Sequence, residues 1–482
     1  MAVNFFALRT RFGASLRPTG EGACGYMGPG IPSAVVAVFA VEFHSMRKLL
    51  LFLLICCLPV LAMERQPHAD YRARREALAK KISNGVAVIF AGTEVEASAA
   101  GYRQTDNFFY LTGWTEPGAA VLVASAREGR PYTEILFLPP RDLTEERWTG
   151  VKLGTDTPGA AATAGFDRVL SLGALDEELP RLLMKEDKVY VEQTGSEALP
   201  TPTSTDLMPW LKRSRAIPGR TPLVDARPVL ASLRTIKDAG ELTLMKKAAG
   251  ASMAAHLAAM KALKPGMNEH EIAAILNYEA AKHGCERPSY APIVGSGFNG
   301  TVLHYSDDDG PINAGDLVVI DAAGEYSMYA DDITRTLPAS GKFTPRQREI
   351  YDIVLGAQQA AMAAFQSGKS TLGRKTENSL DAVAREYIKT HGKDLHGESL
   401  DKYFIHGLGH YVGLFVHDDN DYTVPLGPGM VFTIEPGIYI PEEKFGVRIE
   451  DMFYVDADGK LVKMTAALPS TADEVERAMA GK

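Results

Sequence analysis

The sequence predicts an α/β (α+β) protein with two folded domains, on the basis of three observations. Its 482 residues exceed what a single hydrophobic core usually supports. Short apolar strands and Ala- and Leu-rich helical patterns alternate along the chain, as in proteins with mixed, covered sheets. The segment Thr201–Pro228 is rich in Pro, Ser, Thr and Arg, has no periodic apolar pattern and leads to a domain boundary. We therefore predict an N-terminal domain over 68–225 and a larger domain over 230–475.

The front of the chain contains a pattern typical of a secretory signal peptide. Met46 begins a positively charged start, residues 49–61 are almost wholly apolar, and small residues offer a cleavage site after Ala62. We predict a signal peptide over 46–62 and export to the periplasm or the medium. Residues 1–45 fit no targeting pattern, so we expect translation to start at Met46 and these residues to be a wrongly assigned upstream segment. A disordered extension and an uncleaved anchor are the alternatives.

The composition excludes some classes of function. Hydrophobic residues make up 46% of the chain and charged residues 23%, which is ordinary for a globular protein. The formal net charge of −9, from 51 basic and 60 acidic residues, argues against a nucleic-acid binder, because such proteins carry a basic excess. Removal of the signal peptide would leave Cys285 as the single cysteine, so the mature chain could form no intramolecular disulfide.

The first domain begins with a basic helix, predicted from Tyr71 to Lys81. Short apolar runs, each bounded by Gly or Pro, follow it and predict strands. They lie at Val86–Phe90, Ala119–Ala124 and Glu134–Leu138.

The second domain opens with two Ala-, Leu- and Met-rich helical patterns, Ala239–Leu263 and Glu269–His283. Pro265-Gly266 separates them, and Asn268 suits the N-cap of the second helix. Strands and turns then alternate as far as Asp456. Further helices are predicted at Pro345–Phe365 and Ser379–Lys389.

Two aspartates lie at the ends of predicted strands. Asp316–Asp321 is an apolar strand that ends in a carboxylate, and Asp332–Thr336 is a second strand that begins with one. The polar segment between them fits a hairpin or a longer loop, which could place Asp321 and Asp332 side by side. Two carboxylates that close repel each other unless a cation lies between them. Solvated aspartates at strand ends are the alternative interpretation.

Three histidines lie in a glycine-rich segment, namely His406, His410 and His417. The glycines make a helix improbable and let the backbone run close to a ligand. An oxygen-rich metal site needs only one imidazole as a ligand. Imidazole titrates near neutral pH, so the other two could transfer protons. A lone histidine is more often a packed or surface residue, but three together favour chemistry.

Two glutamates occupy similar positions near the end of the chain. Gly429–Glu435 is a predicted strand that carries Glu435 just before a Pro-Gly turn. Val447–Asp451 is another, and Arg448 and Glu450 share one of its faces because side chains alternate along a strand. A solvated face is again the alternative.

Together, four carboxylates and one imidazole could hold two divalent cations. Such a pair of ions lowers the pKa of a bound water and holds a substrate carbonyl beside it. The set therefore indicates hydrolysis, most simply of a peptide. Its members are Asp321, Asp332, His410, Glu435 and Glu450.

Longer motifs surround these residues. They are Pro288–Gly297, Leu303–Tyr305, Ile320–Ala322, Tyr329–Thr336, His406–His410, Val416–Asp418, Thr433–Tyr439 and Val447–Asp451. From Leu233 to about Thr465 the chain resembles the catalytic domain of the M24 "pita-bread" metallopeptidases, most of all the aminopeptidase P (Xaa-Pro aminopeptidase) family. Tyr102–Pro117 resembles the N-terminal domain of that family. The resemblance implies a pita-bread catalytic domain preceded by a smaller α/β domain.

The resemblance also implies a ligand set for two metal ions. Asp332 and Glu450 would bridge both ions, Asp321 would bind one of them, and His410 and Glu435 would bind the other. Manganese is the usual metal of the resembling enzymes, and a mainly carboxylate set suits such a hard cation.

Four further residues match the active site of the family. His304, His406 and His417 would contact the substrate and assist proton transfer, and Arg448 would organise the site. The implied reaction removes the N-terminal residue from a peptide whose second residue is proline, by attack of a hydroxide that the two metals activate. Glu435 would pass the proton to the leaving nitrogen, and His417 or His304 would stabilise the oxyanion.

Two other readings stay open at this point. Prolidase, which cleaves only Xaa-Pro dipeptides, is the close alternative because it uses the same ligands. A metal-free binding protein on the same fold is the second.

The resembling enzymes are usually homodimers or homotetramers. Phe298 and Met452 depart from the family pattern, where acidic residues are common, and both departures bear on the preference for extended substrates.

Overall fold

The computed structural model describes residues 64–481, apart from 94–100, 127–131, 193–216 and 218–220. The predicted upstream segment 1–45 and signal peptide 46–62 lie outside the described residues. All described residues belong to one compact unit, 63–482. Among them, no helix combines the length and the apolar character that a membrane crossing requires.

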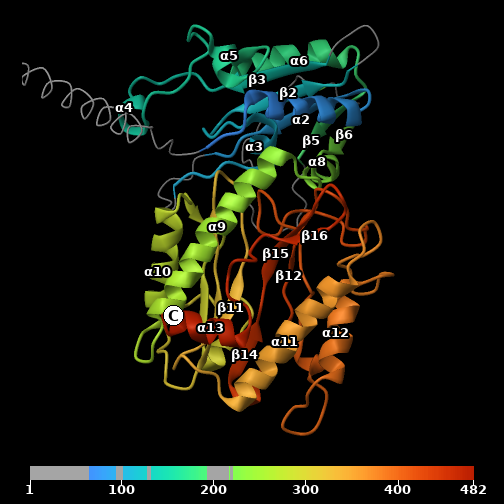
Figure 1. The fold of residues 1–482 in the computed structure, drawn as a ribbon. Helices are drawn as coiled ribbons and strands as arrows, with labels where there is room; N and C mark the ends of the chain where they lie inside the picture. Colours follow the sequence, from blue (N-terminus) through green and yellow to red (C-terminus); the bar gives the residue numbers. More distant parts are fainter. Residues whose placement is uncertain (1–63, 94–100, 127–131, 193–216, 218–220, 482) are drawn as a thin grey trace, which may run out of the picture. The chain divides into compact units, whose positions relative to one another are not determined.

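Six strands of the described residues form the first sheet, in the order β4-β3-β2-β1-β5-β6 (Figure 1). Neighbours pair antiparallel across β1–β2–β3 and parallel elsewhere. The strands are β1 (Gly85–Phe90), β2 (Ala120–Ala124), β3 (Thr133–Leu138), β4 (Val169–Ser171), β5 (Lys188–Val191) and β6 (Leu223–Asp225).

Both faces of this sheet are covered, as the apolar strands predict. Alternate residues of β1 enter different clusters: Ala87 and Ile89 pack with helices α2, α3 and α8, whereas Val86 and Val88 pack with α6. The mixed, covered sheet of the sequence prediction is thus confirmed. The helices of this part are α2 (His68–Lys81), α3 (Asp106–Thr112), α4 (Glu146–Thr149), α5 (Ala160–Ala164), α6 (Leu175–Leu183) and α8 (Arg227–Arg234).

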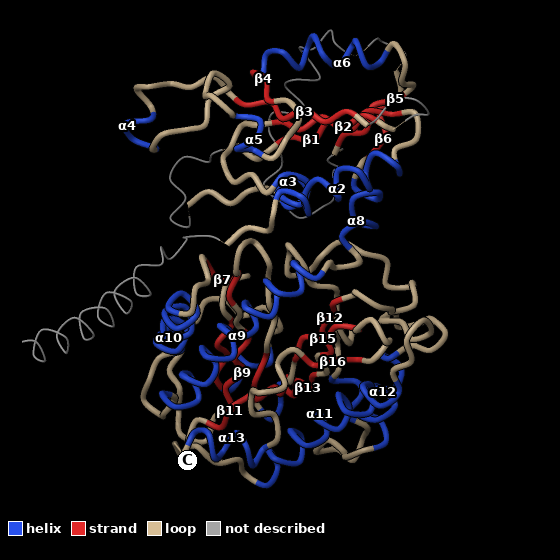
Figure 2. Tube along the Cα trace, turned by 45° about the horizontal axis from the view of Figure 1, so that its top comes forward, coloured by secondary structure: helices blue, strands red, loops and turns tan. Residues whose placement is uncertain are grey.

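Two helix pairs flank the strands of the second part of the chain: α9 packs on α10, and α11 packs on α12 (Figures 1 and 2). Asn268 caps α10 in a capping box with Glu271, so the predicted N-cap is confirmed. Ser379 caps α12 through its side chain. The bounds are α9 (Ala239–Ala262), α10 (Glu269–Lys282), α11 (Pro345–Ala364), α12 (Leu380–Thr390) and α13 (Ala472–Met479).

The strands between these helices form small sheets around a shared apolar core. Strand β9 lies between β8 and β11, β15 lies between β12 and β16, and the pairs β13–β14 and β7–β10 complete the set. The strands are β7 (Arg287–Pro288), β8 (Ile293–Ser296), β9 (Leu317–Asp321), β10 (Gly324–Glu325), β11 (Thr334–Pro338), β12 (Val431–Ile434), β13 (Gly437–Ile440), β14 (Phe445–Arg448), β15 (Asp451–Val455) and β16 (Leu461–Lys463).

Two strand predictions need correction. Asp332 does not begin a strand, because β11 starts two residues later and pairs Thr334 with Asp321. Glu450 does not share a strand with Arg448, because β14 ends at Arg448 and Glu450 forms an isolated bridge to Thr334. In both places the chain leaves a regular ladder just where a carboxylate turns toward a common centre.

Cys285 is a free thiol, buried between α10 and β10. An added Cβ on Gly324 would lie 2.4 Å from its sulfur, so the two segments are in close contact. Burial raises the pKa of Cys285 to about 12.

Candidate metal centre and active-site pocket

All nine residues that the sequence singles out line one pocket of about 750 Å³. They come from strand ends and irregular segments spread over the second part of the chain. The nine are Asp321, Asp332, His304, His406, His410, His417, Glu435, Arg448 and Glu450.

Antiparallel pairing of β9 with β11 places Asp321 next to the segment that carries Asp332. The hydroxyl of Tyr290 lies 2.5 Å from Oδ1 of Asp321 and 2.6 Å from Oδ1 of Asp332. A phenol has one proton and can donate it to only one of these carboxylates at a time. Two carboxylates held against one hydroxyl therefore repel each other unless positive charge lies nearby.

His410 lies at the centre of the remaining donors. Its Nε2 is 3.2 Å from Oδ2 of Asp332, 3.5 Å from Oε1 of Glu435 and 3.9 Å from Oε1 of Glu450. Burial lowers the pKa of His410, but Asp332 and Glu435 outweigh it and raise this pKa to about 9. Ligand atoms of Asp332, His410 and Glu450 all lie within 4.8 Å of one another, close enough to share one ion.

Close backbone contact holds His410 and Glu435 on neighbouring segments. The amide of Thr433 donates to the carbonyl of His410 at 2.9 Å, and that of Glu435 donates to the carbonyl of Leu408 at 2.8 Å. A Cβ on Gly409 would lie 2.1 Å from the carbonyl oxygen of Thr433. The glycine-rich sequence thus lets this segment approach the backbone of β12, whereas the sequence analysis expected a close approach to a ligand. As predicted, no helix forms at 404–410.

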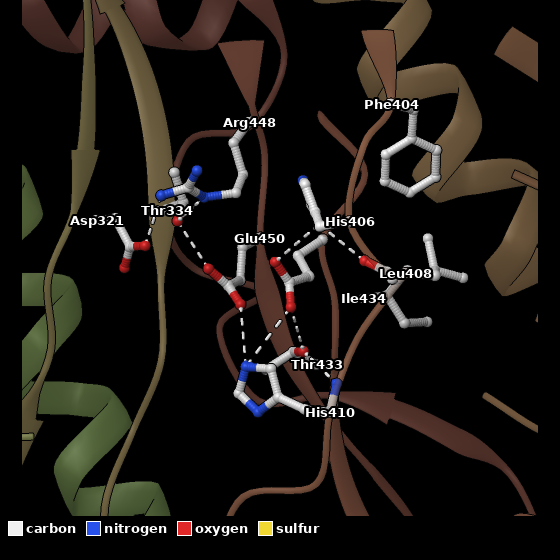
Figure 3. A network of polar contacts seen from close by, with 12 residues as sticks. Asp321, Thr334, Phe404, His406, Leu408, His410, Thr433, Ile434, Arg448 and Glu450 are labelled. Carbon is white, nitrogen blue, oxygen red and sulfur yellow. Dashed lines mark hydrogen bonds and ion pairs between the residues drawn. The ribbon is translucent and has the colours of Figure 1, made fainter. Parts of the chain in front are cut away.

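Glu450 is oriented by a hydroxyl. Thr334 Oγ1 donates to Oε2 of Glu450 at 2.7 Å and accepts from Nε of Arg448 at 3.0 Å. Figure 3 shows Glu450 reaching from Thr334 toward His410. Arg448 also donates from Nη2 to Oδ2 of Asp321 at 2.6 Å, so one guanidinium orients two of the predicted ligands.

Tyr439 links Arg448 to His406 and was missed by the sequence analysis. Nδ1 of His406 lies 2.8 Å from the carbonyl oxygen of Gly407, which can only accept, so Nδ1 carries the proton. Burial and the nearby Arg448 lower the pKa of His406 to about 3, which keeps the ring neutral. Its Nε2 therefore accepts from the hydroxyl of Tyr439 at 2.8 Å, while that hydroxyl accepts from Nη1 of Arg448 at 2.9 Å.

Tyr290 and Tyr439 both lie inside motifs that carry the family resemblance, Pro288–Gly297 and Thr433–Tyr439. That position was the only signal in the sequence for either residue. Neither spacing nor strand alternation distinguishes them from other tyrosines, because their roles depend on partners far away in the chain.

His304 and His417 lie at the more open part of the pocket, and both side chains are exposed. The ring of His417 meets that of His410 edge to face, with centroids 4.2 Å apart. Of the predicted residues, these two have the fewest polar contacts, so they are free to face a substrate.

The donor set fits a divalent metal centre. Burial and mutual repulsion raise the pKa values of Asp332, Glu435 and Glu450, that of Glu435 to about 7. Charged carboxylates packed this tightly need positive charge to offset the loss of water. Four carboxylates with one imidazole are ligands that hard divalent ions accept.

Comparison with known proteins gives two matching family models. "Metallopeptidase family M24" matches residues 243–457, and "Aminopeptidase P, N-terminal domain" matches residues 71–190. The Xaa-Pro aminopeptidase of Escherichia coli K12 is 36% identical over 432 residues, which cover 85% of this chain and 97% of that protein.

Solved structures agree with this. Proline aminopeptidase P II from Yersinia pestis superposes with a TM-score of 0.74 at 33% identity, covering 86% of this chain and all of that one. Aminopeptidase P from Escherichia coli with the inhibitor Pro-Leu gives a TM-score of 0.74 at 33% identity, covering 87% of this chain and 99% of that one. Both expected domain types, and the pita-bread catalytic fold, are therefore confirmed; their boundaries at 68–225 and 230–475 stay predictions.

Proposed function

The chain belongs to metallopeptidase family M24 and is a metallo-aminopeptidase, and we propose that it releases the N-terminal residue from peptides whose second residue is proline. The observation that carries the proposal is the complete set of predicted donors and histidines in one pocket. The proline preference is supported by the relatives named Xaa-Pro aminopeptidase and by the dipeptide Pro-Leu, an inhibitor of the Escherichia coli enzyme. Pro-Leu begins with the residue that such cleavage would leave at the new N-terminus.

The proposed cofactor is a pair of divalent ions, with Mn²⁺ as the first candidate. Asp332 and Glu450 would hold both ions, Asp321 one, and His410 and Glu435 the other. When bound, such ions lower the pKa of water and polarise the substrate carbonyl. Oxygen donors dominate the set, which favours Mn²⁺ over metals that prefer thiolates.

The residues of the chain would then supply the proton transfers. Glu435 lies between two imidazoles, with Oε1 3.5 Å from Nε2 of His410 and Oε2 3.7 Å from Nδ1 of His406. In the proposed reaction its carboxylate accepts the proton of the attacking water and delivers it to the proline nitrogen. His417 or His304, at the open side of the pocket, donates a hydrogen bond to the developing oxyanion.

Proline at the second position changes what the enzyme must do. The scissile nitrogen is part of a tertiary amide and has no N–H, so the enzyme gains nothing from an acceptor aimed at it. A proton must still reach this nitrogen before it leaves. A carboxylate that moves a proton from water to nitrogen meets this requirement.

The two alternative readings are weakened. Prolidase is not favoured, since the named relatives are Xaa-Pro aminopeptidases that the chain matches over nearly their whole length. A metal-free binding protein would have no need for the five donors, all of which line the pocket.

The decisive experiment measures metal content and hydrolysis of three peptides by the wild type and by Glu435→Ala. We expect metal-dependent cleavage of Arg-Pro-Pro, at least about 100-fold slower cleavage of Arg-Ala-Pro, and weak cleavage of the dipeptide Arg-Pro. Glu435→Ala should lower kcat by about 100-fold to 10,000-fold. Absence of metal-dependent cleavage of Arg-Pro-Pro would refute the proposal, and faster cleavage of Arg-Pro would favour prolidase.

Export and assembly are further parts of the proposal. A chain that starts at Met46 and is cleaved after Ala62 would begin at Met63. Sequencing the N-terminus of the exported protein tests this, and a native start upstream of Met46 would contradict it. Light scattering on the purified protein tests whether it forms a dimer or a tetramer.

A further inference from the structure

Arginines anchor both ends of the segment that carries His417. Nη2 of Arg103 donates to the carbonyl oxygen of Leu414 at 2.5 Å, and Nη2 of Arg234 donates to Oδ1 of Asp418. Residues Leu414 to Asp418, below called the His417 segment, are thus fixed just before and just after the histidine. The segment is neither helix nor strand, so no regular ladder of hydrogen bonds fixes it.

A single aspartate connects the two arginines. Asp106, the first residue of α3, has Oδ1 2.7 Å from Nη1 of Arg103 and Oδ2 3.5 Å from Nη2 of Arg234. Arg103 also donates from Nε to Oε2 of Glu325 at 2.6 Å. The charges form one continuous ionic network across the two parts of the chain. In order it contains Glu325, Arg103, Asp106, Arg234, Asp418 and Lys237.

Both ends of this network are buried, which makes them stiff. Glu325, Arg234 and Asp418 are only 3%, 6% and 4% exposed, whereas the side chains of Arg103 and Asp106 between them are 24% and 17% exposed. Moving a buried charge away from its partner leaves both without water or a counter-charge, so such groups keep their places. The backbone adds to this, since the amide of Asp418 donates to the carbonyl of Tyr411 at 2.9 Å.

We propose that Arg103, Asp106 and Arg234 are positioning residues that act on the reaction through His417. The inference rests on the proposed function and takes His417, of the two histidines named there, as the donor to the oxyanion. A displacement of about 1 Å in such a group can cost about 100-fold in rate. The N-terminal part of the chain thereby contributes to catalysis although none of these three side chains lines the pocket.

Asp106→Asn gives the sharpest test, because Asp106 reaches the His417 segment only by way of the two arginines. A double-mutant cycle compares kcat and KM for Arg-Pro-Pro in the wild type, Asp106→Asn, His417→Ala and the double variant. We expect Asp106→Asn to lower kcat about 10-fold and to change KM less than about 3-fold. In the His417→Ala background it should change kcat less than about 2-fold. If kcat of the double variant falls by the product of the two single-variant effects, Asp106 and His417 act independently and the proposal is overturned.

A matched control separates positioning from stability. Glu134→Gln breaks another buried ion pair of the same domain, Arg75 Nε to Glu134 Oε2 at 2.5 Å, which has no contact with the His417 segment. It should lower the Tm and leave kcat unchanged. The same result for Asp106→Asn, a lower Tm with normal kcat, would overturn the proposal.

Hydrogen exchange gives a readout that does not depend on activity. In Arg103→Met, amides of the His417 segment should exchange at least about 10-fold faster than in the wild type, while those of β12 stay protected. Unchanged exchange in the segment would overturn the proposal. A wild type unable to cleave Arg-Pro-Pro would instead remove the proposed function, so the two failures are distinguishable.

Discussion

Replacing Tyr439 with Phe removes one oxygen atom from the centre of the active-site network. The hydroxyl of Tyr439 donates to Nε2 of His406 at 2.8 Å and accepts from Nη1 of Arg448 at 2.9 Å. The ring itself is 2% exposed and can stay in place. The substitution therefore removes one hydrogen bond each from His406 and Arg448 and opens no sizeable cavity.

The expected magnitude follows from those two contacts. A hydrogen bond between neutral groups contributes about 1 kcal/mol net, and one to a charged donor about 1.5–3 kcal/mol. His406 loses the donor that fixes its ring, and Arg448 keeps its bonds to Asp321 and Thr334. If these two hydrogen bonds stabilise the transition state by about 1.5–3 kcal/mol, their loss lowers kcat/KM by about 10-fold to 150-fold.

The assay is the rate of Arg-Pro-Pro cleavage together with urea unfolding. Tyr351→Phe is the matched control, because Tyr351 is equally buried and its hydroxyl donates to the carbonyl of Ser470 at 2.9 Å, away from the pocket. Both variants should lose about 1–2 kcal/mol of unfolding free energy. Only Tyr439→Phe should lose activity. A normal kcat/KM in Tyr439→Phe, or an equal loss in Tyr351→Phe, refutes the reasoning.

Three further predictions concern metal, packing and pH. Asp332→Asn should weaken metal binding by more than about 100-fold, because replacing a residue that only orients a ligand already lowers metal affinity by about 10-fold to 100-fold. Metal analysis after dialysis measures this loss. Gly409→Ala should lower the Tm by several degrees because its Cβ would lie 2.1 Å from the carbonyl oxygen of Thr433, whereas Gly407→Ala, with nothing within 4 Å, should not. Burial lowers the pKa of His256 to about 4, below its value in the unfolded chain. The neutral ring therefore contributes its full share to the free energy of unfolding above about pH 7, and this share is lost as the pH falls toward 4. Between pH 7 and 5 the wild type should lose about 2 kcal/mol more unfolding free energy than His256→Gln, and equal losses in urea titrations would contradict this.

The apolar patterns predicted most of the long elements, because their burial follows from local periodicity. Asn268 and the Pro-Gly break before it placed the start of α10 correctly. Strand ends near the pocket were less predictable. Alternation assigned Asp332 and Glu450 to strands, but β11 begins only at Thr334, and Glu450 forms an isolated bridge to that residue outside the regular ladders.

The charged residues that meet in the pocket could be found from the sequence, whereas the groups that orient them could not. A carboxylate at the end of an apolar strand is conspicuous, because placing it there is costly without a partner. Tyr290, Thr334 and Tyr439 are common strand residues, and their hydroxyl partners lie up to 116 positions away in the chain. The interdomain link through Asp106 was missed for the same reason.

The buried thiol of Cys285 has a practical consequence for spectroscopy. A chain beginning after Ala62 has no other cysteine. Since its pKa of about 12 keeps this thiol protonated and packing shields it, maleimide or spin-label reagents should leave it untouched. One cysteine introduced on the surface, for example at Ser232 or Glu177, would then be the sole reactive position. Two such cysteines, one in each part of the chain, would allow distances between the parts to be followed during turnover without first removing a native residue.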